Sequence, residues 1–560
     1  MGLTTMSPEI GVLLLTIFFY GVWRFHQYLR IAYLTPLRNL PGPPAGSWAY
    51  GNMKEIAAMD NTLLPDTWFK RYGKVFVDRE FLMRPRLWSL DPRAMQHVLS
   101  HPNDFPPPEE TQKALQMVCC LFRAKSTESG GEFWSVRGCF AYAAAAADTL
   151  EQNPAFGPAQ VRDLTHIFVE KSIQLREYWA NVVRSGSTRV NVNKDLSKLT
   201  LDIIGVAGFG YDFNTLNPEG KPNELSLAFS RLFMSSPSIS ALVPFLRTLF
   251  PILKLIRTER VATIEAASEV FHRVGMQLVE ERKTAILKEM SEKHLQGVER
   301  KDLQGRDLLT LLMRANMAKD VPENQRLSDK EVLDQIPTFL LAGHETTSTS
   351  STWALCALSK NPALQKKLRE ELFTVQSDTP TMEELSALPY LDAVVTETLR
   401  LYTPATMSFR VASKDSVIPL SEPFTDCHGK VHNELRVAKG NKVVIPILAM
   451  NRSAEIWGED AMEFRPERWQ QPPEAISAIP GVWGHLLTFI GGPRACIGFR
   501  FSLIELKAIL FTLIRAFEFE LAVPAEDIVA KTEGLQRPSL LSEPEKRYQL
   551  PLLVKPYSTS

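Results

Sequence analysis

The residues best suited to chemistry lie in a short segment near the C-terminus, 489–498, with the spacing F-x-x-G-x-R-x-C-x-G. Its cysteine, Cys496, lies two positions after Arg494, and an apolar helical pattern follows directly. A thiolate is a strong nucleophile and metal ligand, and a nearby cation or helix N-terminus favours it. Gly492 and Gly498 let the backbone approach a flat ligand closely. The segment predicts a metal-ligating thiolate, with a buried structural cysteine in a tight turn as the plainer alternative.

A second group of chemically capable residues lies within a long helical pattern over 329–360. There the sequence AGHETT places the small residues Ala342 and Gly343 beside the acid Glu345 and the alcohol Thr346. Glycine destabilises a helix and threonine is stiff in one, so we expect a ligand to lie against this turn. The alternative is an ordinary helix with a polar kink, because an isolated glycine is a weak signal.

Several charged residues lie between these two segments. Glu397 and Arg400 are three apart on one helix face, where they can meet. Alone they say little, because most such pairs are solvated surface bridges. Arg468 follows in the sequence FRPERW at 464–469. Arg410 suits a carboxylate ligand through its guanidinium group, with an ordinary surface arginine as the alternative.

In their order and spacing these motifs resemble those of the cytochrome P-450 family, from about Pro41 to Pro556. The resemblance is closest to membrane-anchored eukaryotic members, and the AGHETT form suggests a fungal one. It implies a mainly α fold with small β-sheets, a triangular helix-rich prism around a buried haem b. It also implies that Cys496 is the axial thiolate of the haem iron. The other residues that it places at the cofactor are Phe489, Gly492, Arg494, Gly498, Arg410, Ala342 and Gly343.

The resemblance also implies roles for individual residues. Glu345 and Thr346 would deliver protons during dioxygen activation, while the thiolate donates electron density and Gly343 opens a groove for dioxygen. A structural charge cluster would support the cofactor, made of Glu397, Arg400 and Arg468. The expected substrate contacts are Phe339, Ala342, Thr347, Thr406, Met407 and the stretch around Gly534 and Leu535.

The implied reaction inserts one oxygen atom of O2 into a lipophilic molecule, a terpenoid, fatty acid or aromatic compound, in secondary metabolism. Electrons would come from NADPH through NADPH-cytochrome P-450 reductase, with cytochrome b5 as a further candidate partner. Arg494, Arg500 and Lys507 could face an acidic partner, although such charges are more often plain solvated surface.

The N-terminus predicts a membrane anchor. Residues 3–23 carry one charge, on Glu9, and nearly reach the length that spans a bilayer. No basic residue precedes the stretch and no small-residue cleavage site follows it, which argues against a signal peptide. Basic residues follow at Arg24, Arg30 and Arg38. We therefore expect an endoplasmic reticulum membrane protein with a single-pass anchor and basic flank over 1–38 and a cytosolic catalytic domain over 39–560.

The 560-residue chain has a net charge of zero, so no nucleic-acid partner is expected. Its six cysteines lack disulfide-framework or zinc spacing, which favours a reducing compartment. Helical spacing dominates, and the clearest patterns cover 170–184, 261–291, 329–360 and 364–373. Short strand signals occur at 75–77, 86–88 and 442–446.

One stretch, 117–150, departs from the family pattern. Relatives carry a basic helix there that contacts the haem propionates, whereas this chain has low-complexity sequence, and Trp134 and Arg137 lie three apart instead of four. A divergent insertion is one interpretation. A gene-model or splicing error is the favoured one, because the composition breaks inside a family-like context.

Two other functions stay open. The first is a reductase-independent haem-thiolate enzyme of the peroxygenase or isomerase type, against which the Glu345–Thr346 pair argues. The second is an inactive haem-binding or misspliced product, which the stretch 117–150 motivates.

Overall fold

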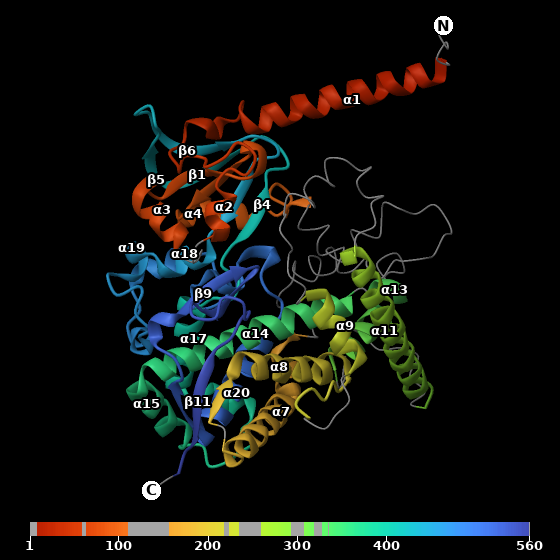
Figure 1. Cartoon of the computed structure of the whole chain (residues 1–560), viewed down its shortest axis with the longest axis vertical. Coiled ribbons are helices and arrows are strands. Elements are labelled where there is room, and N and C mark those ends of the chain that lie inside the picture. Colours follow the sequence, from red (N-terminus) through yellow and green to blue (C-terminus); the bar gives the residue numbers. More distant parts are fainter. Residues whose placement is uncertain are drawn as a thin grey trace. The chain divides into compact units, whose positions relative to one another are not determined.

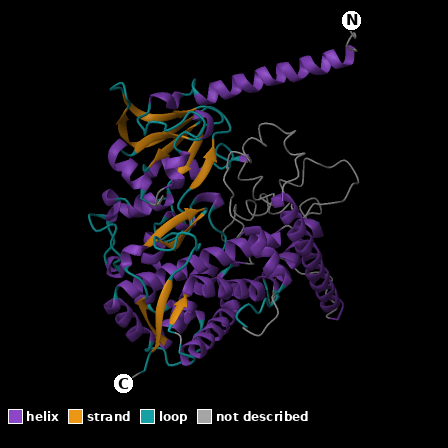
Figure 2. Ribbon diagram, viewed as in Figure 1, coloured by secondary structure: helices purple, strands orange, loops and turns teal. Residues whose placement is uncertain are grey.

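Helices form most of the structure, as the spacing of apolar residues predicts (Figure 1). The computed structural model describes residues 8–58, 63–109, 156–186, 188–217, 223–233, 259–292, 307–317, 328–333 and 335–558. Its strands form only small sheets (Figure 2), so the predicted mainly α fold is confirmed. The atypical stretch 117–150 lies outside the described residues.

The predicted helical patterns correspond to helices of the structure. The pattern at 170–184 lies in α7 (Pro158–Arg184), that at 261–291 in α11 (Glu259–Glu292) and that at 364–373 in α15 (Pro362–Leu372). The pattern at 329–360 corresponds to α13 (Asp329–Leu333) and α14 (Gln335–Lys360). The longer helices are α1 (Pro8–Ala32), α3 (Leu64–Tyr72), α4 (Pro92–Ser100), α7 (Pro158–Arg184), α8 (Val192–Phe209), α9 (Glu224–Phe233), α11 (Glu259–Glu292), α12 (Leu308–Met317), α14 (Gln335–Lys360), α15 (Pro362–Leu372), α17 (Pro389–Leu401) and α20 (Phe499–Ala516). The shorter ones are α2 (Met53–Ala58), α13 (Asp329–Leu333), α16 (Met382–Ser386), α18 (Ile447–Arg452) and α19 (Ala454–Trp457).

The chain forms two units, one of residues 1–108 and 407–449 and the other of 109–406 and 450–560. The division into 1–38 and 39–560 expected from the sequence stays a prediction. In the first unit a sheet of order β1-β2-β7-β4 is antiparallel except between β2 and β7. The strands of this unit are β1 (Val75–Arg79), β2 (Pro85–Ser89), β4 (Ser408–Val411), β7 (Lys442–Ile445) and the antiparallel pair β5 (Ser416–Thr425) and β6 (Val431–Val437).

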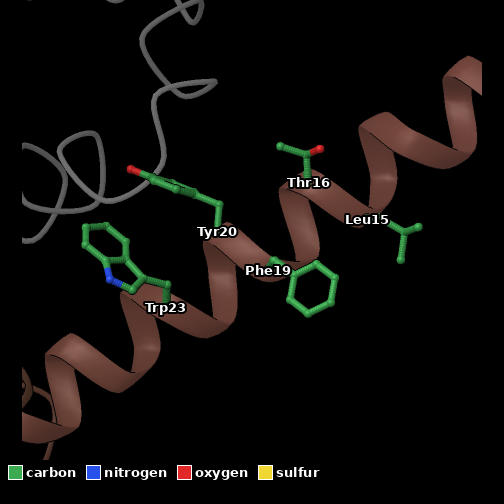
Figure 3. Close-up of a pocket in the computed structure, with 5 residues that line it drawn as sticks. All are labelled: Leu15, Thr16, Phe19, Tyr20 and Trp23. Atoms are coloured by element: carbon green, nitrogen blue, oxygen red, sulfur yellow. The ribbon is translucent and has the colours of Figure 1, made fainter.

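Helix α1, at the start of the first unit, exposes large apolar side chains (Figure 3). Leu15, Phe19, Tyr20 and Trp23 line an open hollow along it, and the Tyr20 and Trp23 ring centroids lie 5.9 Å apart. No helix among the described residues has both the length and the apolar character that crossing a bilayer requires. The single-pass anchor expected over 1–38 stays a prediction, and residues 1–7 lie outside the described part of the chain.

The second unit packs its helices around α14. Helix α14 lies along α8, and α20 lies along α7 and also packs on α14 (Figure 1). Helix α20 is buried on nearly every face, and most of its side chains are apolar, although Glu505 and Lys507 are buried among them. Strands of this unit form a sheet of order β3-β11-β8 and the pair β9–β10. They are β3 (Arg189–Asn191), β8 (Phe517–Leu521), β9 (Ile528–Glu533), β10 (Leu535–Leu540) and β11 (Pro551–Pro556).

Candidate active site

The cysteine loop, residues 487–498, consists of two short 3₁₀ turns ahead of α20. The backbone N–H of Cys496 donates to the carbonyl of Phe489 at 2.8 Å and closes the loop. Between them, Ile490 has a φ of +57°, a left-handed conformation that is strained for a β-branched residue. Its carbonyl accepts from the N–H of Val482 at 2.9 Å, which helps to hold this geometry.

The Cys496 side chain is accessible to solvent and also surrounded by protein. Burial raises the pKa of its thiol, and the backbone N–H of Gly498 lowers it. Arg494 is not among the groups that shift this pKa, and its predicted influence on the thiol stays a prediction. Coordination to a metal ion deprotonates a thiol outright.

Arg494 brings an unpaired donor to the same loop. Its side chain is half-buried, burial lowers its pKa, and its Nε atom is buried without a hydrogen-bond partner among the described residues. Such a donor costs about 1–3 kcal/mol unless a ligand satisfies it. Haem carries two carboxylates and an iron that takes a thiolate, so Arg494 and Cys496 together fit this cofactor.

Helix α14 presents an accessible strip within a largely buried stretch. Ala342 is exposed and Gly343 and Thr346 are half-buried, whereas His344 and Glu345 are buried. The Thr346 hydroxyl donates to the Ala342 carbonyl at 2.6 Å, so its oxygen remains free to accept a hydrogen bond from a ligand. The residues predicted to face dioxygen therefore share one accessible strip, except Glu345.

Gly343 has a packing role that the sequence did not indicate. A Cβ atom on Gly343 would lie 2.9 Å from Cδ1 of Ile204 in α8. Because real Cβ contacts are longer, a larger residue here would require the Ile204 side chain to shift, so the glycine favours the close packing of α14 on α8. The predicted dioxygen groove at this position stays a prediction.

Phe156 brings the α14 strip and the cysteine loop to one region. Its ring centroid lies 5.8 Å from that of Phe339 in α14. A Cβ atom on Gly498 would lie 3.9 Å from the same ring. Phe156 was not among the site residues predicted from the sequence.

Glu345 forms an ion pair with Arg537 of β10. Its other carboxylate oxygen lies 3.7 Å from Nδ1 of His344. Burial alone would raise the pKa of Glu345, yet His344 and Arg537 together lower it below its usual value. The carboxylate is therefore ionised at neutral pH. Arg537 was missed because it lies 192 residues away in the sequence, without a local signal.

The three residues predicted to support the cofactor meet in one buried network. Glu397 accepts from Nε and Nη2 of Arg400 at 2.8 and 2.9 Å, and Nε of Arg468 lies 3.5 Å from it. The indole N–H of Trp469 and the backbone N–H of Arg465 complete its shell, at 3.1 and 3.0 Å. Each oxygen of the Glu397 carboxylate is thereby paired with donors, and the side chains of Glu397 and Arg400 are fully buried.

Asn451 ties this network to the cysteine loop. Nη1 of Arg400 donates to the Asn451 carbonyl at 3.0 Å. The Asn451 side-chain amide donates to the hydroxyl of Thr488 at 2.9 Å, and its oxygen accepts from the N–H of Leu487 at 3.0 Å. Both partners directly precede Phe489. The contacts agree with a supporting role for the network, and that role stays a prediction.

The remaining predicted residues are not part of these contacts. Arg410 belongs to the first unit, where its Nη1 donates to the Ser408 hydroxyl at 3.0 Å and to the Phe409 carbonyl at 2.9 Å. Met407, in the same unit, packs against an aromatic cluster that includes Trp88. Thr406 is buried in the second unit. Their cofactor and substrate contacts stay predictions.

Glu505 in α20 is a buried acid that sequence reasoning did not single out. Neither carboxyl oxygen has a hydrogen-bond partner among the described residues. Burial raises its pKa well above the usual value, and the nearby Thr347 hydroxyl offsets this only in part. Burial therefore favours the protonated form of this carboxyl group.

Replacing Glu505 with glutamine removes the ionisable group at nearly constant size. Because the folded-state pKa exceeds the usual 4.5, the natural protein loses stability as the pH rises above that value, and the variant does not. We expect Glu505→Gln to be more stable by about 1–3 kcal/mol near pH 8, with the difference vanishing near pH 4. Apparent unfolding temperatures across this pH range measure it.

The matched control is Glu518→Gln in β8, where the side chain is exposed. It should follow the natural protein at every pH. A Glu505→Gln variant with the same pH dependence as the natural protein would show that Glu505 is not held neutral in the fold.

Comparisons with known proteins match this chain to one family and to individual relatives. A sequence model of the Cytochrome P450 family matches residues 41–551. Cytochrome P450 monooxygenase 205 of the fungus Postia placenta is 48% identical over 555 residues, which cover 98% of each chain. Cytochrome P450 monooxygenase 128 of the same fungus is 48% identical over 543 residues, or 96% of each chain. The ganoderic acid synthetase of Ganoderma lucidum is 32% identical over 525 residues, 89% of this chain and 90% of that one.

Proposed function

Since the chain belongs to the cytochrome P450 family, we propose that this monooxygenase inserts one oxygen atom of O2 into a lipophilic small molecule with electrons from NADPH. The exposed Cys496 carries this proposal, together with the Nε atom of Arg494, which is buried without a hydrogen-bond partner among the described residues two positions earlier in the loop. The cofactor that these two residues would hold is a haem-thiolate, in the form of haem b. When haem is bound, the chemistry it supplies is dioxygen activation and oxygen transfer to the substrate.

The protein's own residues bind, orient and move protons in this proposal. Sγ of Cys496 would bind the haem iron, and Arg494 would pair with a haem carboxylate. Ala342 leaves room on the accessible strip of α14. The Thr346 hydroxyl, on the accessible strip of α14, would accept a proton at its oxygen and pass a proton on toward the ligand.

We propose a terpenoid, fatty acid or aromatic substrate, used in secondary metabolism. The apolar pair Phe156 and Phe339 supports a lipophilic ligand, because it borders both the α14 strip and the cysteine loop. One relative bears the name ganoderic acid synthetase, which supports a role in secondary metabolism.

We also propose that NADPH-cytochrome P450 reductase supplies the electrons, with cytochrome b5 as a second donor. Membrane association at the endoplasmic reticulum, with the catalytic part in the cytosol, would place the enzyme beside both. The exposed Leu15, Phe19 and Trp23 of α1 support this association, because aromatic and aliphatic side chains partition into the bilayer interface (Figure 3).

Reconstitution tests the proposed reaction. The full chain, loaded with haem, is combined with NADPH-cytochrome P450 reductase in phospholipid vesicles and offered a panel of terpenoids, fatty acids and aromatic compounds under isotopically labelled O2. We expect NADPH-dependent products that each carry one labelled oxygen atom. Product formation with hydrogen peroxide but not with NADPH and reductase would instead establish the reductase-independent alternative.

Thr346→Ala separates proton handling from cofactor binding. We expect it to retain haem and to consume NADPH, while the fraction of electrons recovered in product falls by about tenfold or more and hydrogen peroxide rises. Thr352→Ala is the control, because Thr352 makes the same type of bond, to the Ser348 carbonyl at 2.7 Å, in the same helix. Unchanged coupling in Thr346→Ala, measured as product per NADPH, would remove Thr346 from the mechanism.

A further inference from the structure

The β9–β10 pair is fixed to α14 next to the predicted proton donor. The backbone N–H of Gln536 donates to the carbonyl of Pro404 at 2.8 Å. The Gln536 carbonyl accepts from the indole N–H of Trp353 in α14 at 2.9 Å. The next residue, Arg537, reaches Glu345 on the same helix. Both the strand and the helix are therefore held in place where this ion pair forms.

The ion pair between Glu345 and Arg537 is largely buried. Glu345 is 4% exposed and Arg537 is 15% exposed at the side chain, so water screens the attraction weakly. The Arg537 guanidinium also lies 4.7 Å from the centre of the Tyr548 ring, which fixes it from a second side. The second Glu345 oxygen is buried without a hydrogen-bond partner among the described residues.

Among the described residues, the other titratable group that acts on Glu345 is His344. Its Nε2 lies 2.8 Å from the hydroxyl of Ser197 in α8, and burial lowers its pKa. The hydroxyl of Thr200, also in α8, donates to the backbone carbonyl of His344 at 3.0 Å and not to the Glu345 carboxylate. Arg537 is thus the group that neutralises Glu345 from β10.

A carboxylate bound to a guanidinium group is a poor proton donor, because donation requires that it first be protonated. We propose that Arg537 is a positioning residue that holds Glu345 as a carboxylate against β10, so that proton delivery to Thr346 begins only when this pair opens. The inference rests on the proposed monooxygenase function. Strand β10 begins at Leu535, where the family resemblance leads us to expect a substrate contact, and a contact at this end would loosen the pair.

Two measurements on the full chain test this inference. The first is a double-mutant cycle of apparent unfolding temperature with Arg537→Met, Glu345→Gln and the double variant, which does not depend on turnover. We expect Arg537→Met to lower the unfolding temperature of the natural protein by several degrees, and that of Glu345→Gln much less. Equal losses in both backgrounds would show that the pair is not coupled and would overturn the proposal.

The second is the pH profile of product per NADPH in the reconstituted enzyme. Without Arg537 the buried Glu345 binds its proton more tightly, so we expect the profile of Arg537→Met to move to higher pH with the haem-thiolate spectrum retained. Lys531→Met is the control, because Lys531 lies opposite Arg537 in the β9–β10 pair and its side chain is exposed. An unmoved profile in Arg537→Met would overturn the positioning role.

Variants that fold poorly do not end the test. Arg537→Lys keeps a cation, and we expect its pH profile to lie between those of the natural protein and Arg537→Met; a Lys variant as shifted as the Met variant would contradict the role of charge. Absence of NADPH-driven turnover in the natural protein would instead refute the proposed function. The unfolding cycle would still decide whether Arg537 and Glu345 are coupled.

Discussion

Cys496→Ala will lose the haem-thiolate spectrum and NADPH-dependent product formation will fall by about a thousandfold or more. The sulfur is the only part of Cys496 that can ligate iron, whereas the loop closes through its backbone N–H, which bonds to Phe489. The variant therefore keeps the loop and loses only the ligand. Haem content and absorption spectra of the purified protein measure the first effect, and the reconstituted assay measures the second.

Cys427→Ala is the matched control, because Cys427 is also a free, exposed cysteine. It should retain both spectrum and activity. A Cys496→Ala protein with an unchanged thiolate spectrum would assign the ligand to a different residue and would contradict the site described above.

Glu397→Gln will destabilise the protein by about 3–5 kcal/mol, the typical cost of leaving buried charges unpaired. Arg400 and Arg468 are at most 2% exposed, so water cannot solvate their guanidinium groups once the carboxylate is gone. The Asn451 contacts then transmit the disorder to Leu487 and Thr488. We expect little folded haem protein in vivo and a much lower unfolding temperature for what is recovered.

The control for this prediction is Glu370→Gln. Glu370 pairs with Lys366 at 3.9 Å on the surface, with both side chains well exposed, so its loss should change stability by at most about 1 kcal/mol. Similar unfolding temperatures for the two variants would show that the Glu397 network does not hold the fold together.

The sequence predicted the helices better than the strands, for a physical reason. Helices α7 and α11 repeat apolar residues over many turns, so their signal accumulates along the chain. The pair β5–β6 was not predicted. Pro419 and Pro423 lie within β5, and the pairing register shifts between Pro419 and Phe424, which interrupts the alternation that identifies a strand.

Some residues of the candidate site were predictable from a local motif, and others were not. Cys496 and Arg494 belong to one short segment, and their residue types and spacing were enough to predict a metal-ligating site there. The partners Arg537 and Phe156 become visible only in the fold, because nothing near them in the sequence indicates which residue they will meet. Gly343 was identified by its type, but its contact with Ile204 depends on how α8 packs against α14.

The central claim is that the Cys496 thiolate binds haem iron in a competent pocket. The reduced, carbon-monoxide difference spectrum of membranes that contain the full chain tests it most directly. We expect a strongly red-shifted Soret band, because a thiolate ligand shifts this band to longer wavelength. No haem signal, or a band at the shorter wavelength of iron without a thiolate, would contradict the claim.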